Sequence, residues 1–198
     1  MALYTVIIPF IHTAEGKLDS DPTDAAASHP CPYSFFGRNG IHTSSGYTWE
    51  IFSKEFGSTP DTATRFFMMS DPNKPNTADW NYLFKLIYWD TIKGDLINSQ
   101  ELANSIVDMC FNSGQHEASI IIQRCVMTPT DGIIGQHTVD AINGFPDQHQ
   151  LYLNYQAGRC SYYHDLVENN PKYQVDLVGW LNRVENLNQF NALNNVHV

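Results

Sequence analysis

The sequence predicts a mainly α fold with long loops in the N-terminal half of the chain. Helical periodicity of apolar residues recurs from residue 77 onward, and two long helical patterns follow each other near the C-terminus. Residues 19–46 are instead rich in Asp, Pro, Ser, Gly and His, which is typical of a long irregular segment. A chain of 198 residues is long enough for one domain or two small ones.

The N-terminal elements are short. Residues 2–14 predict a helix or a strand, because their β-branched residues leave both open. Short helices are expected at 48–56 and 61–69, with Pro60 at the start of the second. Residues 77–90 predict a helix with one apolar stripe that packs in the core. The stripe consists of Trp80, Leu83, Phe84, Ile87 and Tyr88.

Residues 99–113 give the clearest amphipathic pattern, and Ser99 is placed to cap this helix. Its apolar side carries Leu102, Ile106, Met109 and Cys110. The opposite side carries Glu101, Ser105, Asp108 and Asn112. We expect this polar side either to be solvated or to line a cleft.

The remaining elements are also predicted to be helical. Helices are expected at 115–126 and 136–143, and then at about 147–168 and 172–187, where Pro171 separates the last two. The first long helix carries an aromatic stripe, formed by Tyr152, Tyr155, Arg159, Tyr162 and Tyr163. The polar end of the chain, from about residue 188, is predicted to fray.

The composition excludes several classes of function. The net charge is -10, and no Lys/Arg cluster reverses it locally, so nucleic-acid binding is not expected. No apolar run reaches the length of a membrane span, and no secretory signal is recognisable at the N-terminus. The four cysteines include no C-x-x-C pair, and neither a metal site nor a specific disulfide is predicted. Cys110 and Cys125 are interpreted as small core residues on helices.

The stretch EGKLDSDPTD holds four carboxylates behind an apolar segment. Partial burial would raise the pKa of Glu15, so that it could donate a proton, while a solvated Asp stays ionised. That pairing is the chemistry of glycoside hydrolysis. Two other readings stay open at this point, a solvated turn and a calcium loop, although the D-x-D-x-D-G pattern of a calcium loop is absent.

Four stretches together resemble one enzyme family. EGKLDSDPTD followed by GRNGIH resembles the signature E-G-G-Y-x-N-D-P-x-D-P-G-G-x-T-N-x-G-I-T of the N-acetylmuramidases of glycoside hydrolase family 108. LIYWDTIKGD and the following DMCFNSG resemble that family's next conserved region. TPTDGIIGQHTVDAIN and GWLNRVENL are similar to the peptidoglycan-binding domain that follows in such proteins. The resemblance implies a lysozyme-like catalytic region at 1–97, a helical peptidoglycan-binding region at 98–190 packed on it, and a polar tail at 191–198.

The resemblance also implies the site residues. Glu15 matches the family's catalytic glutamate, and Asp24 and Asp21 match its two aspartates, with Asp24 the first choice for the second carboxylate. The sequence departs from the signature at Lys17, and Ala25-Ala26 stands where Pro-Gly is expected. The expected substrate-binding residues are Tyr33, His42, Thr43, Trp49, Asp108 and Asn112. For Tyr33 and Trp49 the alternative is simple packing, and for His42 and Thr43 a place in a loop. Asp131 and Gly132 are expected to form a structural turn.

The implied function is cleavage of the β-1,4 bond between N-acetylmuramic acid and N-acetylglucosamine. Two carboxylates and water suffice for this reaction, so no cofactor is expected. Peptidoglycan strands are the expected partner. The chain is expected to be made in the bacterial cytoplasm and to act on the wall after release or non-standard export. The alternatives are a non-catalytic peptidoglycan-binding or secretion-assisting protein, since some relatives are labelled secretion activators, and a lytic transglycosylase.

Overall fold

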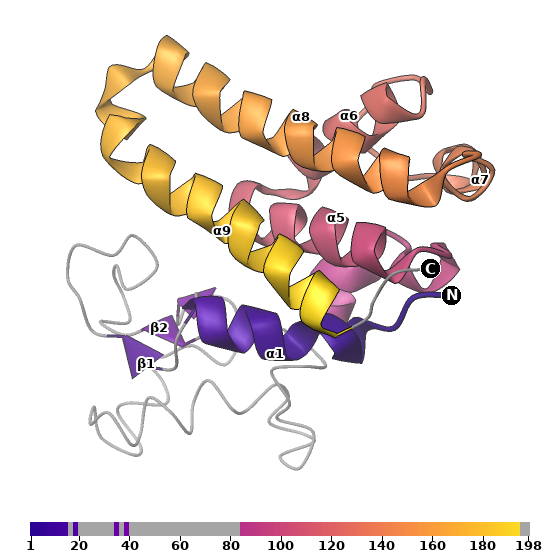
Figure 1. The fold of residues 1–198 in the computed structure, drawn as a ribbon, viewed down its shortest axis with the longest axis horizontal. Coiled ribbons are helices and arrows are strands. Elements are labelled where there is room, and N and C mark those ends of the chain that lie inside the picture. Colours follow the sequence, from indigo (N-terminus) through magenta and orange to yellow (C-terminus); the bar gives the residue numbers. More distant parts are fainter. Residues whose placement is uncertain (16–17, 20–33, 36–37, 40–83, 195–198) are drawn as a thin grey trace. The chain divides into compact units, whose positions relative to one another are not determined.

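The computed structural model describes residues 1–15, 18–19, 34–35, 38–39 and 84–194. These residues are mainly helical, which confirms the predicted fold class (Figure 1). The chain divides into two compact units, one formed by Ile8–Lys85 and the other by Met1–Ile7 with Leu86–Val198. The predicted helices at 48–56 and 61–69 lie outside the described residues.

The N-terminal segment is a helix, so the choice between helix and strand is settled. Helix α1 spans Tyr4–Glu15 and contains Pro9. Proline has no backbone N–H, so one bond of the helical ladder is missing at this position. The Thr13 hydroxyl donates a hydrogen bond to the Pro9 carbonyl (2.8 Å).

Three two-residue strands form a small antiparallel sheet after α1. They are β1 (Leu18–Asp19), β2 (Ser34–Phe35) and β3 (Arg38–Asn39), in the order β1-β2-β3. Leu18 pairs with Phe35, and Phe35 pairs with Arg38. The segment predicted to be irregular therefore contains some paired backbone.

The apolar stripe predicted for 77–90 is partly wrong. Its described end is the π-helix η3, Lys85–Trp89, followed by the 3-10 helix η4, Gly94–Leu96. Ile87 is 39% exposed, whereas Trp89 is fully buried. A π-helix closes its hydrogen bonds between residues five apart, so the buried face shifts relative to an α-helical pattern.

Six further helical segments lie in the larger unit, and apart from the end of the last one their bounds are close to those predicted. They are α5 (Gln100–Ser113), α6 (Gln115–Cys125), α7 (Gln136–Asn143), α8 (Gln148–Asn169), η5 (Pro171–Tyr173) and α9 (Gln174–Leu193). Figure 1 shows α8 and α9 running antiparallel as a helical hairpin, and α5 packs against both α6 and α8. Ser99 caps α5 as predicted, and Asp147 caps α8, by accepting hydrogen bonds from Leu102 N and Gln150 N.

Helix α5 is buried on both sides, which corrects the expectation for its polar side. The predicted apolar side is buried, but Glu101, Ser105 and Asp108 are also at most 1% exposed. They contact polar groups of α8 and α9 rather than solvent or an open cleft. Periodicity in α5 alone predicts one buried face, and its second face is buried because this helix lies at the centre of the unit.

The end of α9 also differs from the prediction. The helix continues to Leu193, beyond the residue where fraying was expected. Asn191 is 1% exposed, accepts a hydrogen bond from Asn104 of α5 (2.8 Å) and donates one to the Tyr152 hydroxyl of α8 (3.3 Å). A polar sequence at this end therefore packs in the interior through its amides.

Candidate functional site

Glu15 is the last residue of α1. The small antiparallel sheet begins at Leu18, so Glu15 lies at the junction between the helix and β1. The role of Glu15 as a proton donor stays a prediction from the sequence.

The other predicted residues of the N-terminal site lie outside the described residues. They are Asp21, Asp24, Tyr33, His42, Thr43 and Trp49. The roles of these residues stay predictions.

Asp108 lies at the centre of an ion network that joins α5, α8 and α9. Its two carboxylate oxygens accept hydrogen bonds from Arg183 Nε (2.9 Å) and Arg159 Nη2 (2.5 Å). Burial by itself would raise the pKa of Asp108, but the guanidinium groups of Arg183 and Arg159 outweigh burial and hold that pKa below its usual value. Arg159 also donates to the Ser105 hydroxyl (3.0 Å), which in turn donates to Gln156.

Asn112 belongs to the same face of α5 and is half-buried. Its side-chain amide donates to the Tyr163 hydroxyl of α8 (2.9 Å). Asp108 and Asn112 therefore both hold α5 to the helical hairpin. In the part of the chain that the structure describes, these two side chains connect helices to one another. Substrate contact by Asp108 and Asn112 stays a prediction.

Asp131 and Gly132 form a turn between α6 and α7. The Asp131 carboxylate accepts hydrogen bonds from Gln123 Nε2 (2.6 Å) and Ile133 N (2.9 Å), and the Gly132 amide donates to Gln123 Oε1 (3.0 Å). Gly132 has a φ of 78°, and a Cβ there would overlap the His116 ring. The D-G motif is thus accounted for as a structural turn, as expected.

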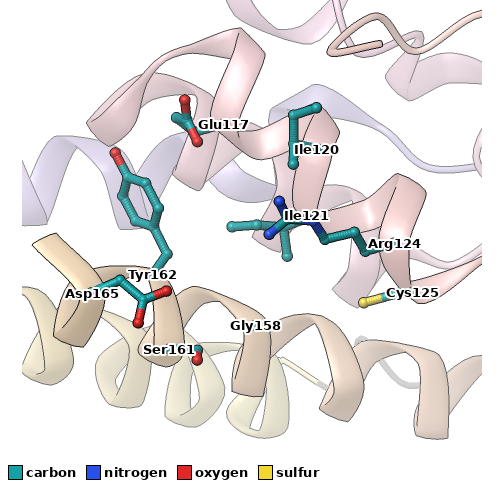
Figure 2. Close-up of a pocket in the computed structure, with 9 residues that line it drawn as sticks. All are labelled: Glu117, Ile120, Ile121, Arg124, Cys125, Gly158, Ser161, Tyr162 and Asp165. Carbon is teal, nitrogen blue, oxygen red and sulfur yellow. The ribbon is translucent and has the colours of Figure 1, made fainter. Parts of the chain in front are cut away.

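A groove of about 210 Å³ lies between α6 and α8 (Figure 2). It is lined by Glu117, Ile120, Ile121, Arg124, Cys125, Gly158, Ser161, Tyr162 and Asp165. In Figure 2, Glu117, Tyr162 and Asp165 gather toward one end, while Arg124 and Cys125 lie toward the other. Burial raises the pKa of Tyr162, and the nearby Glu117 carboxylate raises it further.

Gly158 lets the two helices approach each other at this groove. A Cβ on Gly158 would lie 2.7 Å from Cγ2 of Ile121. This groove was not predicted, although the sequence contains a signal for it. Glu117 and Arg124 are seven residues apart on one predicted helix, and a glycine stands inside the next long one.

The described cysteines do not form disulfides. Cys110 is buried on α5, as predicted, whereas Cys125 is only partly buried because it lines the groove. Cys160 is also a free thiol. In the described part of the chain, no group of three or more His, Cys, Asp or Glu side chains is arranged to hold a metal ion. No helix described by the structure combines the length and apolar character needed to cross a membrane.

The comparison with protein families decides the identity of the chain. The family model described as Glycosyl hydrolase 108 matches residues 8–114, which is more than half of the sequence. The chain belongs to the glycosyl hydrolase 108 family. A second model, described as Predicted Peptidoglycan domain, matches residues 117–185. Both matches confirm the resemblance seen in the sequence motifs.

One solved structure is similar over nearly the whole chain. It is described as the structure of Brucella abortus SagA, with a TM-score of 0.64 and 15% sequence identity. The match covers 96% of this chain and 94% of that chain, and at this identity it shows a shared fold. Among curated proteins, no relative matches this glycosyl hydrolase 108 chain.

Proposed function

We propose that this chain is a peptidoglycan hydrolase of the N-acetylmuramidase type, in which Glu15 is the general acid. The family match supports glycoside chemistry, and the peptidoglycan-domain match supports peptidoglycan as the polymer. The observation that carries the assignment is the position of Glu15. It ends α1 inside the matched region, directly before the small antiparallel sheet.

In the proposed mechanism, Glu15 protonates the glycosidic oxygen between N-acetylmuramic acid and N-acetylglucosamine. Asp24, or else Asp21, is the second carboxylate. Carboxyl groups about 5 Å apart would give retention of configuration, and a separation of about 6.5–9.5 Å would give inversion. We further propose that the protein is made in the bacterial cytoplasm and acts on the cell wall.

Product analysis tests this proposal. Purified peptidoglycan is digested with the wild type, with Glu15→Gln and with Glu168→Gln, and the products are identified by mass spectrometry. Glu168 is an exposed glutamate of α8 outside the groove, so it is a matched control. We expect reducing muramic acid ends from the wild type and the control, and a rate about 10²–10⁴ times lower from Glu15→Gln. Anhydro ends would instead indicate a lytic transglycosylase.

A second candidate is a non-catalytic peptidoglycan-binding or secretion-assisting protein on the same fold. The observation that favours it is the altered signature, because Lys17 replaces a glycine and Ala25-Ala26 replaces Pro-Gly next to the proposed acid. The peptidoglycan-domain match begins at residue 117, well after those positions in the sequence. Sedimentation of the wild type with peptidoglycan from several bacteria, without any cleavage, would favour this candidate.

A further inference from the structure

We propose that the groove between α6 and α8 binds the peptide stem of peptidoglycan, and that it does so through the charged groups at the two ends of a short peptide. This inference rests on the proposed function for the identity of the polymer. It adds which part of the polymer is bound, and by which residues. All nine residues that line the groove lie within the peptidoglycan-domain match, residues 117–185.

The two helices present charges of opposite sign at the two ends of the groove. Glu117 lies in the first turn of α6 and Arg124 in its last turn. Asp165 of α8 lies at the Glu117 end, together with Tyr162 (Figure 2). The groove thus has an acidic end and a basic end, with Ile120 and Ile121 between them.

These charged groups are not used to hold the fold together. Among the described residues, neither the Arg124 guanidinium nor the Asp165 carboxylate has an ion pair or a side-chain hydrogen bond. The Glu117 carboxylate lies 3.2 Å from the exposed ring of its neighbour His116. By contrast, Arg159 and Arg183 in the same unit both form ion pairs with Asp108. The groove charges are therefore available to a ligand.

The spacing of the charges suits a short peptide. Residues seven apart on an α-helix lie about 10 Å apart along its axis. An extended peptide advances about 3.3–3.6 Å per residue, so the same length corresponds to about three residues. A peptide stem offers a free side-chain amine and a free carboxylate at such a separation, and these groups complement the acidic and basic ends of the groove.

The glycan strand is the alternative occupant, and the groove fits it less well. A neutral sugar offers no charged group that could pair with the Arg124 guanidinium or with the Asp165 carboxylate. Sugar sites also need aromatic faces for stacking, and the groove is lined by Tyr162 as its single aromatic ring among the described residues. Charge complementarity therefore favours the peptide.

Calorimetric titration of the full chain tests the proposal. The probe is a synthetic tripeptide with one free side-chain amine and a free C-terminal carboxylate. A second probe has the same sequence with both groups blocked, and a third is a peptide-free N-acetylglucosamine oligosaccharide. We expect the free tripeptide to bind roughly twofold to thirtyfold more tightly than the blocked one, because it can form two ion pairs at solvent-exposed positions.

Matched variants assign that binding to the groove. Arg124→Gln and Asp165→Asn are each expected to weaken binding of the free tripeptide about 1.4- to fivefold, since each removes one solvent-exposed ion pair. The controls are Lys172→Gln and Asp176→Asn, which alter exposed charges outside the groove and should leave binding unchanged. All four positions are exposed, and circular dichroism verifies that each variant is folded.

Binding of the oligosaccharide without binding of the free tripeptide would overturn the inference. Tripeptide binding that survives both groove substitutions would also overturn it. Digestion of whole peptidoglycan by the wild type is measured alongside. Digestion without tripeptide binding would overturn the groove assignment alone. If the wild type neither digests peptidoglycan nor sediments with it, the proposed function is overturned as well.

Discussion

Asp108 joins three helices through one carboxylate. It lies on α5, and its partners Arg159 and Arg183 lie on α8 and α9. Asp108 and Arg159 are both fully buried, so each compensates the other's charge in an environment where a lone charge is very costly. Asp108 is therefore the residue at which the packing of the larger unit is most sensitive to a small chemical change.

Replacing Asp108 with asparagine is expected to lower the free energy of unfolding by about 3–5 kcal/mol, because two guanidinium groups lose their counter-charge inside the protein. Urea unfolding followed by circular dichroism measures the change. Asp176→Asn is the control, since Asp176 is exposed in the first turn of α9, and its change should stay below about 1 kcal/mol. Equal changes for the two variants would show that the buried pair contributes little.

Acid should reveal the same ion network. The pKa of Asp108 is lower in the folded than in the unfolded chain, so unfolded chains bind a proton first as the pH falls. The stability that Asp108 contributes is complete above its unfolded pKa of about 3.9, and it is lost as the pH falls from there through the folded pKa. The unfolding free energy of the wild type should therefore fall more steeply below about pH 4 than that of Asp108→Asn. Parallel slopes would contradict this.

The role of Asp108 could be predicted only in part. Helical periodicity correctly placed it opposite the apolar side of its helix. Its partners are 51 and 75 residues away along the chain, so no local pattern could pair them. Gln123 and Asp131 are only eight residues apart, and there the D-G sequence was enough to predict a structural turn.

At the scale of elements, the contact between α6 and α8 depends on Gly158. Gly158→Ala would place a methyl group against Ile121, and the overpacking is expected to cost about 1–3 kcal/mol. Gly179 of α9 is the matched control, because a Cβ there meets nothing within 4 Å. Gly179→Ala should instead stabilise the helix by about 0.5–1 kcal/mol. Thermal unfolding compares the two, and equal shifts would contradict the close approach of α6 and α8.

Helix starts could be predicted from the sequence where a capping side chain bonds to the backbone of its own helix. Ser99 and Asp147 each accept a hydrogen bond from the backbone at the start of their helices, and both helix starts were predicted within a residue. The π-helix at Lys85–Trp89 was not predicted, because its register depends on the burial of Trp89. The end of α9 was missed for a similar reason, since Asn191 is held by residues of two other helices.

At the scale of the whole molecule, the two family matches share one set of packed helices. Helix α5 belongs to the Glycosyl hydrolase 108 match, whereas α8 lies in the peptidoglycan-domain match, and the two helices pack together. The first family match ends at residue 114 and the second begins at residue 117. The second segment of the larger compact unit begins earlier, at Leu86. The domain boundary predicted at residue 97 stays a prediction.

The net charge of -10 predicts how the protein responds to salt. Bacterial walls are anionic, so long-range repulsion should weaken binding at low ionic strength. Raising the salt concentration from about 10 mM to about 150 mM shortens the screening length from about 30 Å to about 8 Å. Sedimentation with purified walls should therefore increase over this range. A decrease would indicate that a locally basic surface meets the wall.

Whether Glu15 drives hydrolysis at muramic acid is measured by digesting peptidoglycan in ¹⁸O-labelled water. Mass spectrometry then shows which sugar carries the new oxygen. We expect one ¹⁸O atom at each new reducing muramic acid end with the wild type, and almost none with Glu15→Gln. Label on N-acetylglucosamine, unlabelled anhydro ends, or equal labelling by Glu15→Gln would contradict this expectation.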